Sequence, residues 1–151
     1  MTSLISSETR IKVSSVLNRD TTNYGKQNLI DGSAETCWNS EQGLPQNILL
    51  DFPSPVLVES IVLQFQGGFA GKTCIAVGST PESPNDYHVE IGRFYPQDIN
   101  PTQTFNFTAT EGLKRVKIIF EEGTDFYGRI TIYKLDILGK KLFTSDSSIS
   151  I

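Results

Sequence analysis

The chain has few of the residues that carry most metal and nucleophilic chemistry. Its 151 residues include one histidine, His88, and two cysteines, Cys37 and Cys74. A histidine-based metal cluster needs several such residues, and a Ser-His-Asp triad would have to use His88. The cysteines lack C-x-x-C spacing, so neither a zinc site nor a disulfide framework is indicated. We therefore expect an ordinary strand histidine and two free, buried thiols.

The sequence also lacks long hydrophobic runs and an excess of positive charge. No stretch reaches about 18 apolar residues, the length that marks a membrane-spanning helix. With 13 Lys and Arg against 17 Asp and Glu, the formal net charge is −4 at pH 7. Nucleic acids and anionic membranes are therefore not expected as direct partners. Residues 1–10 contain no basic segment followed by an apolar run, so we expect an intracellular protein.

Short strands dominate what is present. Apolar residues recur at every second position, as in Ile48, Leu50 and Phe52, which is typical of strands with one buried face. Glycine or proline interrupts nearly every such run and leaves little room for an ordinary helix. The pattern predicts about eight strands, at 11–17, 47–52, 56–66, 73–78, 86–94, 103–108, 113–121 and 129–138. Many short strands with frequent turns indicate an all-β, antiparallel sandwich or barrel.

The length and the even composition suit one folding unit. No internal repeat or linker divides the chain, so we expect a single domain over residues 1–142. Residues 143–151 are rich in serine and are expected to form a disordered tail.

The segment from Asn28 to Trp38 is the most informative part of the sequence. Asp31 and Thr36, with two further oxygen-bearing side chains between them, could hold a hard cation such as calcium. The same short polar side chains could instead satisfy the backbone groups of their own turn. Trp38 is the one tryptophan and is expected to be a core residue below this loop.

Several short motifs follow one another in a characteristic order. They are Ser14-Ser15, Asn28-x-x-Asp31-Gly32, Thr36-x-Trp38, the strand Ile48 to Phe52, the strands at 113–116 and 129–133, and a closing Leu138-Gly139. In this order they resemble the signature of the discoidin, or coagulation factor type C, domain family. The resemblance covers nearly the whole chain and implies an eight-stranded antiparallel jelly-roll β-sandwich.

Two departures from the family pattern concern disulfides and calcium. Secreted members clamp their ends with a terminal cysteine pair, which is absent here and agrees with an intracellular protein. Calcium-binding members of the related carbohydrate-binding group place a carboxylate where this chain has Lys134. An ammonium cannot ligate calcium, but it can neutralise a nearby oxygen-rich loop. No cofactor is expected, and Asp31 and Thr36 remain the candidate ligands should calcium bind.

Within the family, the chain is most similar to a small intracellular group that restrains transcription by orphan nuclear receptors through protein contact. The residues that carry this similarity lie at 13–19, 35–40, 64–69 and 124–129. The resemblance implies a non-catalytic transcriptional corepressor in the nucleus and cytoplasm, with an orphan nuclear receptor as partner. Because the chain has no Leu-x-x-Leu-Leu docking motif, such a contact would use another surface.

The resemblance also places the binding surface on loops at one end of the sandwich, at about 18–27, 40–46, 66–72 and 121–128. The candidate contact residues in and beside these loops are Tyr24, Gln42, Phe69, Phe126, Tyr127 and Arg129. Arg129 could bind a partner's carboxylate or carbonyl group, or it could form a structural pair with Asp125 or Glu121.

Two other functions use the same loops. A carbohydrate-binding jelly roll would combine aromatic stacking with a few polar donors. An enzyme could use Glu121 and Asp125 as acid and base, but nothing in the sequence marks a nucleophile or a cofactor, so catalysis is not expected. The oligomeric state has no signature in the sequence.

Overall fold

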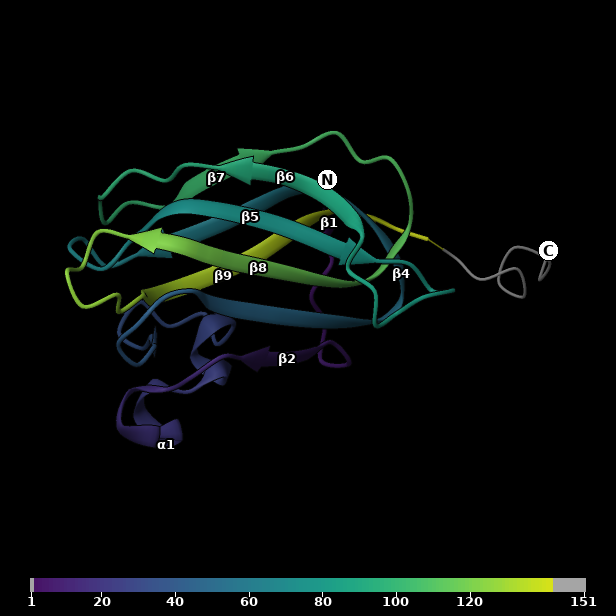
Figure 1. Ribbon diagram of the computed structural model, residues 1–151. Coiled ribbons are helices and arrows are strands. Elements are labelled where there is room, and N and C mark those ends of the chain that lie inside the picture. Colours follow the sequence, from purple (N-terminus) through teal and green to yellow (C-terminus); the bar gives the residue numbers. More distant parts are fainter. Residues whose placement is uncertain (1, 143–151) are drawn as a thin grey trace.

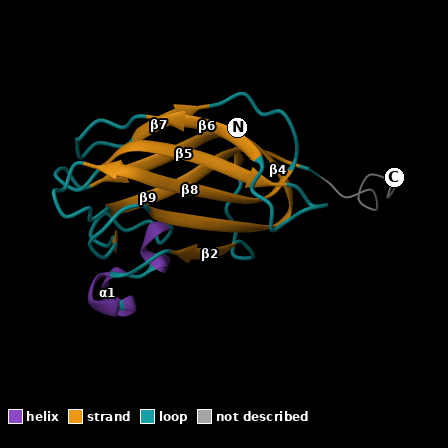
Figure 2. Ribbon diagram, in the orientation of Figure 1, coloured by secondary structure: helices purple, strands orange, loops and turns teal. Residues whose placement is uncertain are grey.

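The computed structural model describes residues 2–142 and is built almost entirely from strands (Figures 1 and 2). The nine strands in these residues are β1 (Thr2–Ser3), β2 (Arg10–Val13), β3 (Trp38–Asn39), β4 (Gln46–Phe65), β5 (Gly71–Ser79), β6 (Val89–Phe94), β7 (Gln103–Asn106), β8 (Leu113–Gly123) and β9 (Thr131–Lys141). The helix α1 (Thr21–Tyr24) and the 3₁₀ turns Leu17–Arg19 and Lys26–Leu29 lie together beside one end of the sandwich. Across residues 2–142, no helix has the length and apolarity needed to cross a membrane. The predicted tail at 143–151 lies outside the described residues.

All strand pairs are antiparallel, and β4 joins the two layers of the sandwich. The first half of β4 pairs with β2 and β8, and β8 continues to β5 and β6. The second half of β4 pairs with β7 and β9, and β9 also carries β1 and β3. Between the halves the register shifts from Asp51 to Val56, where two prolines cannot donate ladder hydrogen bonds. The predicted all-β jelly-roll sandwich is confirmed.

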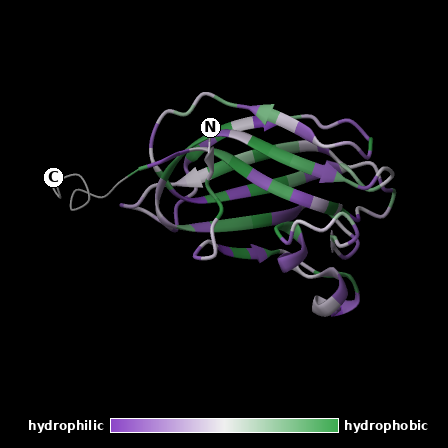
Figure 3. Cartoon of the chain, turned by 180° about the vertical axis from the view of Figure 1, so that it is seen from behind, coloured by the Kyte–Doolittle hydropathy of each residue, from purple (hydrophilic) through white to green (hydrophobic). Residues whose placement is uncertain are grey.

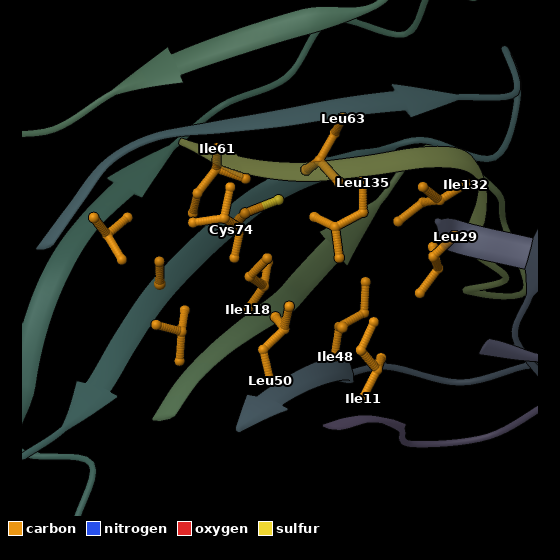
Figure 4. Packing of buried hydrophobic residues seen from close by; sticks show 14 of the residues in the cluster. Ile11, Leu29, Ile48, Leu50, Ile61, Leu63, Cys74, Ile118, Ile132 and Leu135 are labelled. Carbon is orange, nitrogen blue, oxygen red and sulfur yellow. The ribbon is translucent and has the colours of Figure 1, made fainter. Parts of the chain in front are cut away.

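The core lies between the layers and follows the predicted alternation. Ile48, Leu50 and Phe52 from the first half of β4 have no exposed surface, and neither have Ile61 and Phe65 from its second half. The register shift between Val58 and Ser60 explains why buried positions change from even to odd numbers within this one strand. Figure 4 shows Ile48, Leu50 and Ile61 facing the same interior as labelled side chains of β5, β8 and β9, and Figure 3 shows the hydrophobic stretches lying along the strands.

Each predicted strand is present, but several differ from the prediction in their bounds, and two short strands were not predicted. The strand expected at 11–17 ends at Val13, because the chain turns into a 3₁₀ segment in which Asn18 and Arg19 have positive φ angles of 55° and 56°. The strands expected at 47–52 and 56–66 form the single strand β4. The short strands β1 and β3 were not predicted, since two residues show no periodicity.

Of the two cysteines and the histidine, Cys74 lies where the sequence predicted, and Cys37 and His88 differ from the prediction. Cys74 is buried and Cys37 is half-buried, and both are free thiols whose pKa is raised by burial. His88 is not in a strand as predicted. It lies one residue before β6, exposed, with Nδ1 3.5 Å from the Asp86 carboxylate. Backbone hydrogen bonds from Ser83 to Thr80 and from Asp86 to Ser83 keep the preceding residues in turns.

Candidate binding site at the loop end

Three of the four predicted loops are tied together at one end of the sandwich. The backbone N–H of Thr124 donates to the carbonyl of Ala70 at 2.9 Å, and the Ala70 N–H donates to the Thr124 hydroxyl at 3.0 Å. The N–H of Gly43 donates to the carbonyl of Tyr127 at 2.8 Å. Figure 1 shows this end opposite the one at which β9 ends. The loops at 40–46, 66–72 and 121–128 therefore present one surface, which we call the loop end.

An arginine and three aromatic rings form a cluster on this surface. The Phe126 side chain is 93% exposed and Tyr127 is 57% exposed, and their rings pack edge to face at 5.2 Å. The Arg129 guanidinium carbon lies 5.1 Å from the centroid of the Phe69 ring and 5.7 Å from that of Tyr127. Four predicted contact residues from two distant loops are thus brought together. Exposed aromatic rings beside an arginine are typical of protein-binding hot spots.

Arg129 also forms the structural pair that the sequence left open, and its partner is Asp125. Its Nε lies 2.9 Å from Asp125 Oδ2 and its Nη2 lies 3.2 Å from Oδ1, while its backbone N–H donates to Oδ2 at 3.0 Å. The other candidate, Glu121, pairs with Arg93 at 2.8 Å. Because its donors hold one carboxylate, Arg129 has a fixed orientation between the rings, with 32% of its side chain exposed.

We predict that the pair of Asp125 and Arg129 stabilises the fold at neutral pH and that this contribution decreases at low pH. The hydrogen bonds from Arg129 hold the pKa of the Asp125 carboxyl below its ordinary value of 3.8. A carboxyl group whose pKa is lower in the folded than in the unfolded state stabilises the fold at pH values above the unfolded-state pKa. This stabilisation is lost as the pH falls through the folded-state pKa. Asp125→Asn should therefore lower the melting temperature at pH 7, and the difference from wild type should shrink below about pH 4. A difference that stays constant from pH 7 to pH 2, in parallel thermal melts, would contradict this assignment.

Two predicted contact residues lie beside the cluster without joining it. Tyr24 is the last residue of α1 and is half-buried, and Gln42 is exposed in the 40–46 loop. The helical segment is connected to that loop by the N–H of Asn18, which donates to the Glu41 carboxylate at 3.1 Å. Among the described contacts, none links Tyr24 or Gln42 to the four clustered residues. Their role as contacts stays a prediction.

Residues Asp98 and Asn100, which no sequence pattern marks, support the loop end. Asp98 accepts from the Gly68 N–H at 2.7 Å and from the Thr124 hydroxyl at 3.3 Å, and Asn100 accepts from the Gly67 N–H at 2.7 Å. These bonds fix the glycine pair before Phe69. The available signal was that two adjacent glycine N–H groups need acceptors, but it does not reveal where in the chain those acceptors lie.

The candidate calcium ligands contact each other directly. The Thr36 hydroxyl donates to Asp31 Oδ2 at 2.5 Å, and the Ser33 N–H donates to Asp31 Oδ1 at 3.0 Å. Both carboxylate oxygens thus accept hydrogen bonds from their own loop, as the alternative interpretation expects. Across residues 2–142, no three His, Cys, Asp or Glu side chains gather as a metal site would need. Lys134 lines a groove that Gly32 and Ser33 also line, but in the described chain it makes no ion pair with Asp31.

We predict that calcium is not required for folding. The melting temperature should stay within about 1 °C when a chelator is added and when calcium is then added in excess, since a ligand that binds the native state raises stability with its occupancy. The measurement is a thermal melt followed by circular dichroism. A rise of several degrees with calcium would show that Asp31 and Thr36 hold the ion despite Lys134.

No protein-family model matches the chain, but curated relatives do. The chain is 50% identical over 139 residues to a nuclear receptor 2C2-associated protein of Danio rerio, and the alignment covers 92% of this chain and 96% of the relative. It is 46% identical over 140 residues to the Homo sapiens protein of the same name, and this alignment covers 93% of this chain and 98% of the relative.

Solved structures share the fold at low sequence identity. An F5/8 type C domain from Bacteroides fragilis has a TM-score of 0.79 at 14% identity, over 93% of this chain and 97% of that one. A CBM32 domain from Clostridium perfringens, solved in complex with GalNAc-β-1,3-galactose, has a TM-score of 0.75 at 19% identity, over 91% of this chain and 100% of that one. At such identities the likeness establishes the galactose-binding-like jelly-roll fold and nothing about ligands.

Proposed function

The chain belongs to the nuclear receptor 2C2-associated protein family and has the discoidin fold, and on that premise we propose that it is a non-catalytic protein-interaction module that binds a nuclear receptor through its loop end. The name shared by the relatives supports a receptor as partner. We further propose that binding represses transcription and that the protein works in the nucleus and cytoplasm.

One observation carries the proposal: the cluster of Phe69, Phe126, Tyr127 and Arg129. Phe126 is 93% exposed, and an apolar ring held this far into solvent gains free energy when a partner covers it. The loops beneath it are joined by the hydrogen bonds of Thr124 and Asp98, so little conformational entropy should be lost on binding. Such preorganised aromatic side chains are the features that dominate interface energetics.

The direct test is a titration of the purified chain with purified nuclear receptor 2C2. Phe126→Ala combined with Tyr127→Ala should weaken binding by about 30-fold or more, since two hot-spot rings are lost and each 1.4 kcal/mol corresponds to about tenfold. Both side chains are exposed, so the melting temperature should change little. The matched control is Tyr87→Ala, because Tyr87 lies in the segment that follows β5, away from the loop end, where its ring contacts Lys117 of β8.

A second variant examines the base of the cluster. Phe69→Ala with Arg129→Ala removes the ring and the cation that contact each other at 5.1 Å. If both double variants fold and bind the receptor like wild type, the loop-end model is wrong. If receptor binding persists while binding of galactose is lost, the loop end is a carbohydrate site instead. Corepression is tested separately, with a receptor-driven reporter in cells expressing wild type or the Phe126→Ala, Tyr127→Ala variant.

A further inference from the structure

One edge of β9 is only partly paired. Along its other edge β9 pairs with β4 from Ile132 to Lys141. On this edge β1 pairs with Leu138 and Gly139, and β3 pairs with Thr131 and Ile132. Between these two short strands, no segment of the described chain pairs with residues 133–136. The open stretch is about 13 Å long at 3.3 Å per residue.

The backbone of Leu135 faces this opening. The carbonyl of Ile137 accepts a hydrogen bond from the Leu4 N–H at 2.8 Å, so the Ile137 backbone points toward β1. Because backbone groups alternate along a strand, the N–H and carbonyl of Leu135, two residues earlier, point the same way. The Leu135 side chain packs in the core (Figure 4), so only the backbone groups of Leu135 face the unpaired edge of β9. An unpaired N–H and carbonyl are a template for one more strand.

A groove of about 590 Å³ lies over this opening, with Leu135 and Lys134 among its lining residues. Ile5 contributes from the N-terminal segment, and Ile30, which is 44% exposed, contributes from the position that follows the 3₁₀ turn Lys26–Leu29. None of the loop-end residues Phe69, Phe126, Tyr127 and Arg129 lines it. The groove is therefore separate from the surface proposed above.

Two charged side chains, Lys134 and Asp136, line the groove, and only Asp136 has described hydrogen-bond partners. The Asp136 carboxylate already accepts from the Ser3 hydroxyl at 2.6 Å and from the Ile137 N–H at 2.9 Å. Lys134 is exposed, and in the described chain it has no carboxylate within ion-pair distance. Lys134 thus leaves a positive charge beside the open strand edge, available to a carboxylate that binds there.

We propose that this groove is a second binding site, at which an extended acidic segment of a partner protein adds a short strand to β9 between β1 and β3. Main-chain hydrogen bonds to Leu135 hold the segment, and Lys134 selects a carboxylate side chain next to the central residue. Strand addition to an open sheet edge is a general way of binding peptides.

The experiment is an NMR titration of the ¹⁵N-labelled full chain with the peptide acetyl-Glu-Ala-Glu-amide, whose three residues span about 10 Å and fit the open stretch. The Leu135 amide should shift most, and methylation of the alanine nitrogen should abolish the shift because that nitrogen then lacks its proton. Lys134→Glu should weaken binding of the acidic peptide at least fivefold and make the protein prefer acetyl-Lys-Ala-Lys-amide. Lys140→Glu is the matched control, since Lys140 is an exposed β9 lysine outside the groove, and it should bind like wild type.

Several outcomes would overturn the inference. It fails if the N-methylated peptide binds as well as the parent, or if Lys134→Glu and Lys140→Glu behave alike. It also fails if the Leu135 amide shifts with protein concentration alone, because the occupant is then a second copy of the chain. A shift produced by galactose in place of the peptide would assign the groove to a sugar. None of these results depends on receptor binding at the loop end.

Discussion

Replacing Trp38 with alanine is expected to lower the free energy of unfolding by about 3–5 kcal/mol, which is a large part of the stability of a domain of this size. The Trp38 side chain has no exposed surface, and its ring lies 6.4 Å from that of Phe120. Its Nε1–H donates to the carbonyl of Ser15 at 2.9 Å. The substitution therefore leaves both a large cavity and an unpaired carbonyl.

The measurement is urea denaturation followed by far-ultraviolet circular dichroism, since the variant contains no tryptophan to report fluorescence. Trp38→Phe keeps an aromatic ring but loses the hydrogen bond, so its unfolding free energy should fall between those of wild type and Trp38→Ala. If Trp38→Ala is soluble and unfolds at the wild-type urea concentration, Trp38 is not the core residue that the structure shows.

Gly139→Ala should have an effect of similar size, about 3 kcal/mol or more, by overpacking instead of by a cavity. A Cβ atom at this position would lie 1.8 Å from the carbonyl oxygen of Leu57 and 3.2 Å from the nitrogen of Glu59. Both are backbone atoms of β4, so neither can turn away as a flexible side chain would. The methyl group would have to separate β9 from β4 next to the register shift between Val58 and Ser60.

Lys140→Ala is the control for Gly139→Ala, because Lys140 is the next residue of β9 and is exposed. It should change the unfolding free energy by less than about 0.5 kcal/mol in the same urea titration. If Gly139→Ala is as mild as Lys140→Ala, the two strands are not held as closely as the backbone distances require.

The sequence by itself determined the fold class and most of the core. Alternating apolar residues decide which side of each strand is buried, so the pattern alone assigns Ile48, Leu50 and Phe52 to the core, where all three lie. The same local reasoning placed Trp38 in the core. It failed where the signal was too short, at β1 and β3, and where a turn redirected the chain before the apolar run was complete, after Val13.

For the candidate site, the sequence named the residues, and the tertiary structure decided which of them meet. Phe69 and Arg129 lie in loops far apart in the chain, and their contact depends on the hydrogen bonds between Ala70 and Thr124 and on the bracing by Asp98. The choice of Asp125 over Glu121 as the partner of Arg129, and the open edge at Leu135, also depend on how the strands pair. Such features are set by backbone hydrogen bonds and loop geometry between distant segments, which local hydrophobic periodicity does not encode.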